Sequence, residues 1–257
     1  MSEREDQLIR ENLLKHRKLV DRISLVFRSM RKRGTIYREY VEPLLIAVVA
    51  ALFIRQFVVE AFKIPSGSMI PTLRIGDHLL VNKFVYGPRI PFTDLRIFTW
   101  KEPKRGEIIV FRYPEDETKN FIKRVVGVPG DKVQIIRGRL MINDTPVSIV
   151  ELNVPEEEQR DAGYSLYGRT RQYEEDLGGV KHRIQYQWGL ADKDYGPLLV
   201  PKDSVFVMGD HRDNSQDSRV WGFVKFNKIL GRALVIYWSW DGKDRWVRWE
   251  RIGTLIR

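Results

Sequence analysis

The sequence contains no cysteine among its 257 residues. This absence excludes disulfide bonds, thiol nucleophiles and cysteine-ligated zinc sites. Histidine is also scarce, because only His16, His78, His182 and His211 occur, and they lack the spacing of metal ligands. We therefore expect no metal site, and the sequence indicates no other cofactor.

Long apolar runs are scarce as well, and the one uninterrupted run extends from Leu44 to Ile54. A membrane-spanning helix needs about 20 residues, so a span would cover residues 41–62 and include Arg55 and Glu60 near its far end. A buried core helix of a soluble domain is the alternative. The basic residues before the run favour a membrane anchor. A cleavable secretory signal fits less well, because the region before the run is too long.

The net charge of +10 raises the possibility of a nucleic-acid partner. However, residues 1–40 contain eleven basic and six acidic residues and lie directly before the apolar run. This placement predicts a cytoplasmic N-terminus in contact with anionic lipid, not a nucleic-acid interface. Apolar residues recur at close to a 3.5-residue period over residues 3–32, which indicates a basic amphipathic helix within 1–40.

The remaining region, 63–257, is predicted to be a mainly β domain outside the cytoplasm. Its expected strands are short, rich in Val, Ile, Leu, Phe and Tyr, and separated by Gly, Pro and Asp. They are Asp77–Tyr86, Glu107–Arg112, Phe121–Gly127, Lys132–Arg137, Arg139–Ile142, Ser204–Met208 and Arg232–Trp240. Residues from about 145 to 200 are polar and are interpreted as an insertion or small subdomain on this β core.

Two serines, Ser66 and Ser68, flank a glycine between Pro65 and Pro71, just after the apolar run. Proline restricts φ and glycine permits a tight turn, so the segment is expected to be a stiff extended loop that presents its hydroxyls. A serine held in this way is a candidate nucleophile. The alternative is a simple linker that leaves the anchor.

A serine nucleophile requires a base, and the sequence offers two candidates. His211 lies in a polar loop, where Asp210 and Asp213 are expected to stabilise the imidazolium and make it a poorer base. Lys123 lies in an apolar strand, on the same face as Phe121. If that face is buried, desolvation lowers the pKa of the amine and makes it a competent base. An exposed lysine at the edge of the sheet is the alternative.

Four blocks of sequence resemble, in the same order, the bacterial type I signal peptidases, which are membrane-bound Ser-Lys proteases. The blocks cover residues 65–73, 104–111, 121–131 and 209–222. The resemblance implies that Ser68 is the nucleophile and Lys123 the general base. It also implies that Ser66 contributes its hydroxyl to the oxyanion hole, together with the Ser68 N–H, and that Ser215 orients the lysine amine.

The resemblance further implies two groups of residues around these four. A supporting polar network would consist of Arg124, Asp210, Asp217 and Arg219. A pocket for small substrate side chains would consist of Ile64, Met69, Leu73, Leu79, Val110, Phe111, Phe121 and Ile122. The family usually has asparagine at the position of His211, and the resemblance assigns no catalytic role to this histidine.

The implied function is removal of N-terminal signal peptides from exported preproteins, with cleavage after a small-x-small motif. The implied location is the bacterial inner membrane, with one span and an extracytoplasmic catalytic domain. Three other classes of protein are alternatives. A soluble Ser-Lys self-cleaving repressor would lack the anchor, a membrane-anchored binding protein would not need the four blocks, and a nucleic-acid binder would explain only the charge.

Four tryptophans, Trp238, Trp240, Trp246 and Trp249, lie among arginines near the C-terminus. Tryptophan favours the membrane interface, so these residues are candidates for contact with the bilayer. The alternative is that some of them belong to the core.

Overall fold

The computed structural model describes residues 20–26, 37–90, 93, 96–155, 170–187, 194–243 and 245–256. The chain divides into two compact units, residues 1–55 and 56–257, and each is described by itself. Most of the amphipathic helix predicted for residues 3–32 lies outside the described residues, although residues 20–26 are helical.

The first unit is dominated by α2 (Glu42–Phe57), which follows a π-helical turn (Tyr37–Val41). Pro43 is tolerated because it lies in the first turn of α2, where its missing N–H would have no partner inside the helix. Residues 38–57 are long and apolar enough to cross a membrane, with a mean hydropathy of 1.6, and none of the α2 side chains is buried. This exposure favours the predicted anchor over a core helix.

The end of the predicted span was wrong. The helix ends at Phe57 and not at Phe62, because β1 (Val59–Lys63) pairs antiparallel with β2 (Asp77–Asn82). The apolar residues of β1 therefore belong to a strand of the second unit.

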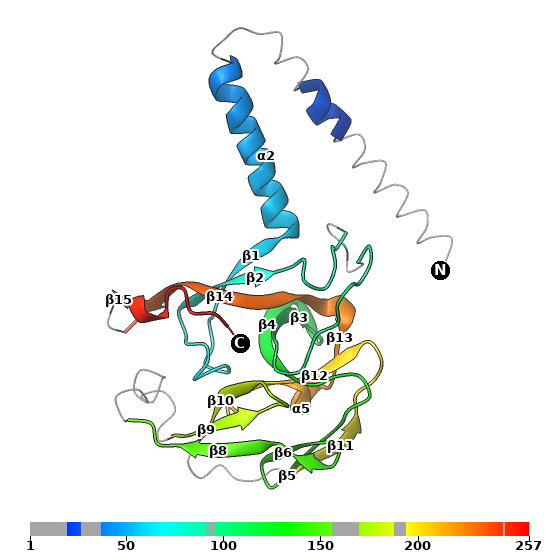
Figure 1. The fold of residues 1–257 in the computed structure, drawn as a ribbon, viewed down its shortest axis with the longest axis vertical. Helices are drawn as coiled ribbons and strands as arrows, with labels where there is room; N and C mark the ends of the chain where they lie inside the picture. Colours follow the sequence, from blue (N-terminus) through cyan, green and yellow to red (C-terminus); the bar gives the residue numbers. More distant parts are fainter. Residues whose placement is uncertain are drawn as a thin grey trace. The chain divides into compact units, whose positions relative to one another are not determined.

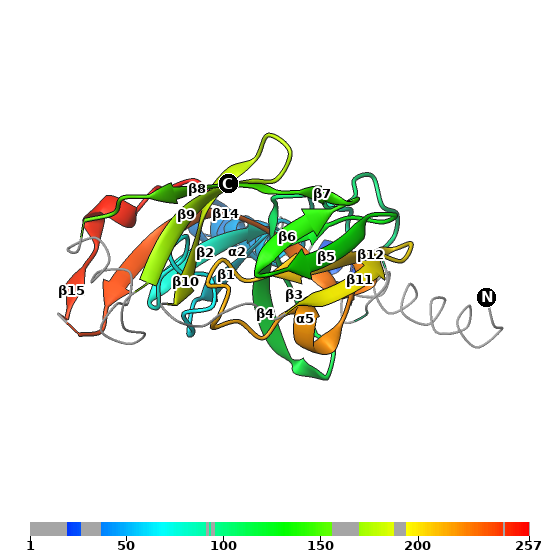
Figure 2. The ribbon, with the colours of Figure 1, turned by 90° about the horizontal axis from the view of Figure 1, so that it is seen from below.

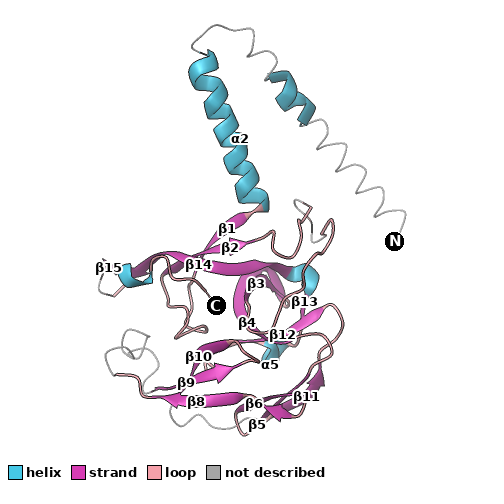
Figure 3. Cartoon of the chain, in the orientation of Figure 1, coloured by secondary structure: helices cyan, strands magenta, loops and turns pink. Residues whose placement is uncertain are grey.

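The second unit is built from strands, as Figure 3 shows in magenta. Its largest sheet has the order β1-β2-β14-β3-β4-β12-β13, and β15 pairs with β14. The further strands of this sheet are β3 (Ile108–Tyr113), β4 (Asp116–Gly127), β12 (Ser204–Met208), β13 (Val224–Lys225), β14 (Ile229–Asp241) and β15 (Trp246–Val247). A short helix, α5 (Ser218–Trp221), follows β12 (Figure 1).

Two smaller sheets lie beside each other in the second unit (Figures 1 and 2). One has the order β10-β9-β8 and the other the order β11-β5-β6-β7. Their strands are β5 (Lys132–Ile136), β6 (Arg139–Ile142), β7 (Thr145–Pro146), β8 (Ser148–Leu152), β9 (Thr170–Asp176), β10 (Lys181–Gln187) and β11 (Tyr195–Leu199).

The mainly β fold is confirmed, and each of the seven predicted strands is present. The sequence missed β8 to β11 in the polar region at about 145–200. These strands were hard to recognise because they bury polar side chains: Glu175 on β9 and Gln185 on β10 are 0% and 2% exposed. Buried polar residues replace the apolar alternation that normally predicts a strand.

The four tryptophans near the C-terminus are not core residues. Their exposed fractions range from 36% at Trp238 to 67% at Trp246. They lie on β14, on β15 and in a 3-10 turn (Trp249–Arg251), so aromatic surface is available at this end of the largest sheet.

Candidate active site

The loop that carries the two serines is fixed by its apolar residues and its backbone. Met69 and Leu73 are both fully buried in a cluster that also includes Ile64. The N–H of Ile64 donates to the carbonyl of Asp77 at 2.8 Å, and the N–H of Leu73 donates to Met69 at 2.9 Å. This anchoring holds Ser68, which is 8% exposed, in one position. The segment is therefore a structured loop and not a simple linker.

Strand β4 brings Lys123 to this loop. Its Nζ lies 2.7 Å from the Ser68 Oγ, and the Nζ is 5.3 Å from the centroid of the Phe121 ring. Lys123 is 4% exposed, because the largest sheet is covered on both faces at this end of β4. The lysine is therefore not the exposed edge residue of the alternative interpretation.

Burial lowers the pKa of the Lys123 amine from 10.5 to about 8. Asp217 and Asp210 act in the opposite direction, since their negative charges favour the ammonium form, and Arg219 again lowers the pKa. Desolvation is the largest of these effects. A sizeable fraction of the amine is thus neutral near pH 8, and a neutral amine next to a hydroxyl can accept its proton.

The two residues face a cavity of about 710 Å³. Six residues predicted from the sequence line this cavity: Ser66, Ser68, Phe121, Ile122, Lys123 and Ser215. The structure therefore brings together segments that are more than 140 residues apart in the chain.

The other six predicted pocket residues do not line this cavity. Ile64, Met69, Leu73 and Leu79 pack in one apolar cluster below the serine loop, and Val110 and Phe111 are buried on β3. Their apolar character reflects the core that supports the cavity, because Val110 and Phe111 pair across the strands with Ile122 and Phe121.

Sequence reasoning also missed lining residues. They are Pro65, Gly67, Ile75, Asn120, Asp213, Asn214 and Gln216. Most of them lie in the same four blocks, directly beside predicted residues, so proximity in sequence was the available signal. Asn120 lies one residue before Phe121, because β4 begins at Asp116, earlier than predicted.

The predicted polar network surrounds the site as two ion pairs. Arg124 donates from Nε and Nη2 to the two carboxylate oxygens of Asp210, at 2.8 and 2.7 Å, and both side chains are fully buried. Arg219 bonds Asp217 from Nε and Nη2 at 2.8 Å each. Asp217 also accepts the Gly209 N–H at 3.0 Å, so this pair fixes the loop that carries Ser215.

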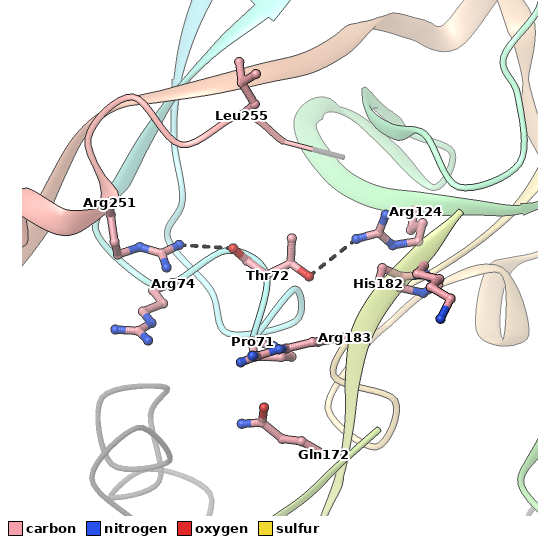
Figure 4. A pocket seen from close by; sticks show the side chains of 10 residues that line it. Pro71, Thr72, Arg74, Arg124, Gln172, His182, Arg183, Arg251 and Leu255 are labelled. Carbon is pink, nitrogen blue, oxygen red and sulfur yellow. Dashed lines mark hydrogen bonds between the residues drawn. The ribbon is translucent and has the colours of Figure 1, made fainter. Parts of the chain in front are cut away.

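Thr72 links the first ion pair to the serine loop (Figure 4). Its hydroxyl donates to Asp210 at 2.5 Å, and Arg124 lies 3.4 Å from the same hydroxyl. Arg251 donates to the Thr72 carbonyl at 3.1 Å. The segment after Ser68 is therefore held from both sides by arginines.

Ser215 lies in the cavity, but its predicted hydrogen bond to Lys123 is not among the hydrogen bonds of the described residues. Its Oγ is buried next to Gly209, where an added Cβ would lie 2.3 Å from that Oγ and 2.4 Å from the Ser68 carbonyl oxygen. Gly209 thus permits Ser215 and Ser68 to approach one another closely.

The expectation for His211 was wrong. The histidine is fully buried, and burial lowers the pKa of its imidazole to about 4. Asp210 and Asp213 do not stabilise the imidazolium, because Asp210 is paired with Arg124 and Asp213 accepts the backbone N–H of Gln187. His211 is therefore neutral near neutral pH.

A buried amine of lowered pKa at a serine hydroxyl, in an open cavity, is the arrangement of hydrolases that use a serine nucleophile. The comparisons with known proteins agree. A model of the family "Signal peptidase, peptidase S26" matches residues 37–238. The chain is 41% identical over 215 residues to a signal peptidase I of Pseudomonas fluorescens (79% of this chain, 72% of the relative).

Two further relatives match a similar share of the chain. A signal peptidase I of Pseudomonas aeruginosa is 39% identical over 234 residues (84% of this chain, 78% of the relative). A signal peptidase I of Aquifex aeolicus is 34% identical over 228 residues (79% of this chain, 84% of the relative). The chain therefore belongs to the signal peptidase family, peptidase S26, and is a serine endopeptidase.

The lowered pKa of Lys123 predicts a stability cost that depends on pH. Between about pH 8 and 10.5 the folded protein binds fewer protons than the unfolded chain, so stability rises with pH in this interval. Below about pH 8 the lysine is protonated in both states, and the buried ammonium lowers the free energy of unfolding by on the order of 3 kcal/mol. We expect Lys123→Met to raise the free energy of unfolding at pH 7 by up to about 3 kcal/mol, and to lose this advantage above pH 10.5.

Urea unfolding of the detergent-solubilised variants at both pH values checks this expectation. Lys202→Met, at an exposed position, serves as the matched control and should change stability little at either pH. A Lys123→Met variant that is less stable than the parent at pH 7 would contradict the expected cost.

Proposed function

We propose that this chain removes N-terminal signal peptides from exported preproteins by hydrolysing the bond that follows a small-x-small motif. One observation carries the proposal: the Nζ of Lys123 lies 2.7 Å from the Ser68 Oγ at the wall of an open cavity. Membership of the signal peptidase family supports the substrate class.

In the proposed mechanism the neutral Lys123 amine accepts the proton of the Ser68 hydroxyl as the Oγ attacks the scissile carbonyl carbon. The tetrahedral oxyanion would accept hydrogen bonds from the Ser68 N–H and the Ser66 hydroxyl. The lysine ammonium would then donate its proton to the leaving amine. A water molecule, deprotonated by the same lysine, would hydrolyse the acyl-enzyme, with Ser215 orienting the amine.

The cavity walls support a preference for small side chains. Phe121 and Ile122 lie next to Lys123 in the cavity, and buried residues fill the space behind them. A large side chain at the subsite would have to displace this packed core, which is costly. Alanine-sized side chains would fit without rearrangement.

We also propose that α2 spans the inner membrane once, with residues 1–40 in the cytoplasm and residues 63–257 outside. The apolar, unburied character of α2 supports the span, and the basic excess before it supports the orientation. Exposed Trp246 and Trp249 are suited to contact with the lipid interface. Secretory preproteins and membrane lipid are the expected partners, and no nucleic acid is expected.

The two serines are expected to differ when they are replaced by alanine. Ser68→Ala removes the nucleophile and should leave no measurable cleavage of a detergent-solubilised preprotein. Ser66→Ala removes one oxyanion donor and should lower kcat by about 10²–10³ with little change in KM. Equal, complete loss in both variants would contradict this division of roles, and an active Ser68→Ala would contradict the proposed function.

Cleavage should depend on the ionisation of Lys123. Because the base must be neutral, kcat/KM is expected to rise with pH through about 8 and to level off above that value. Lys123→Arg should be inactive at every pH, because a guanidinium does not deprotonate. A rate that rises through about pH 4 instead would follow the titration of His211 and would reject the lysine base.

The proposed topology can be tested with a protease added to spheroplasts. The β domain should be digested, whereas an epitope placed in residues 1–40 should remain intact until the membrane is permeabilised. Protection of the β domain together with digestion of the epitope would show the opposite orientation.

A further inference from the structure

A second cavity, of about 290 Å³, shares the serine loop with the catalytic cavity. Residues 65–68 and Ile75 line the catalytic cavity, whereas Pro71, Thr72 and Arg74 line the second one (Figure 4). Its other walls come from β4, from the β9–β10 hairpin and from the C-terminal segment after β15. The second cavity is therefore distinct from the catalytic cavity, although one loop separates them.

The second cavity is lined by positively charged side chains. Of the ten described residues that line it, none is aspartate or glutamate, and five are arginine or lysine: Arg74, Arg124, Lys181, Arg183 and Arg251. The carboxylates that pair with three of these five, Asp77, Asp210 and Glu174, are not among the described lining residues. A hollow lined by charges of one sign attracts ions of the opposite sign. The cavity is therefore suited to an anion.

A buried amide in the wall narrows the class of anion. Gln172 of β9 lines the cavity and is 3% exposed, and its Oε1 has no hydrogen-bond partner among the described residues. Buried amide oxygens normally accept a hydrogen bond, so this oxygen lacks a donor. An ionised carboxylate has no O–H to donate. Hydrogen phosphate and a phosphoglycerol group carry both charged oxygens and an O–H, so they fit the lining better than an acidic side chain of a peptide.

The arginines of the cavity are also suited to phosphate. A guanidinium presents two parallel N–H groups, which match two oxygens of a phosphate. Figure 4 shows the Arg183 guanidinium and the Gln172 amide directed to the side of the cavity where Arg74 lies. Charged donors from β10 and from the serine loop therefore lie around the same space as the amide.

We propose that this cavity binds a phosphate group that carries or adjoins a hydroxyl, supplied by free phosphate or by the headgroup of an anionic phospholipid. Arg74, Lys181 and Arg183 donate to the phosphate oxygens, and the ligand hydroxyl donates to the Gln172 Oε1. The proposal concerns binding alone and does not depend on the proposed function.

The test is calorimetric titration of inorganic phosphate into the detergent-solubilised full chain at pH 8, in about 0.15 M sodium chloride. We expect saturable binding to one site. Arg183→Gln and Lys181→Gln should each weaken it at least about fivefold, because each removes a charged donor. Both side chains are exposed, so neither variant should disturb the fold, and each checks the other.

Arg171→Gln is the matched control. Arg171 is an exposed arginine of the same hairpin that is not among the described lining residues, so this variant should bind phosphate within about twofold of the parent. Sulfate and succinate test the role of the hydroxyl. At pH 8 both are dianions without an O–H, so they should bind at least about fivefold more weakly than phosphate.

Nanodiscs distinguish the two sources of the phosphate group. The full chain is placed in phosphatidylcholine alone, or in three parts phosphatidylcholine to one part phosphatidylglycerol, and phosphate is titrated again. Loss of phosphate binding in the mixed discs assigns the cavity to the lipid headgroup, because the lipid then occupies it. Equal phosphate affinity in both discs assigns it to free phosphate. Either result supports a phosphate site.

Three results would overturn the proposal: no saturable binding of phosphate to the parent, equal affinities for phosphate and sulfate, or equal losses in Arg171→Gln and Arg183→Gln. The same titration with Ser68→Ala should match the parent, because Ser68 does not line this cavity. A Ser68→Ala variant that still cleaves preprotein would therefore reject the proposed function and leave the binding result unchanged.

Discussion

The buried contact between the Lys123 amine and the Ser68 hydroxyl is the constraint on which the rest of the structure depends. Removal of an amine from water lowers its pKa, because an apolar environment disfavours the charged ammonium form. The fold removes the amine from water by placing Lys123 on a strand that is covered on both faces. The cavity that Ser68 and Lys123 both line then provides access to the amine.

The same strand also supplies an arginine that pairs with one of the carboxylates near the amine. Side chains alternate along β4, so Lys123 faces the cavity while the adjacent Arg124 points to the opposite face and binds Asp210. Without Arg124 as its partner, Asp210 would raise the pKa of the Lys123 amine more than the paired carboxylate does. Because Asp210 and Asp217 each have an arginine partner, their carboxylates can fix the surrounding loops without holding the amine fully protonated.

Much of the fold and part of the site could be predicted from the sequence. Strands with apolar residues were recognisable, and the serine loop, Lys123 and the Arg124–Asp210 pair lie in short characteristic blocks. The buried state of His211 could not be read from its neighbours, because adjacent carboxylates point to other partners, such as Arg124. The exact cavity lining was also inaccessible, since an apolar residue such as Met69 looks the same in sequence whether it lines a pocket or supports it.

The polar region between about 145 and 200 is connected to the serine loop, which its sequence does not indicate. Arg212 is buried and bonds Glu175 of β9, and its backbone N–H donates to Gln185 of β10 at 3.0 Å. The preceding residue, His211, donates to Ser68. One short segment therefore joins the serine loop on one side to the β9–β10 hairpin on the other. A hairpin bound in this way is part of the frame that positions Ser68, because two consecutive residues, His211 and Arg212, connect the Ser68 carbonyl to β10.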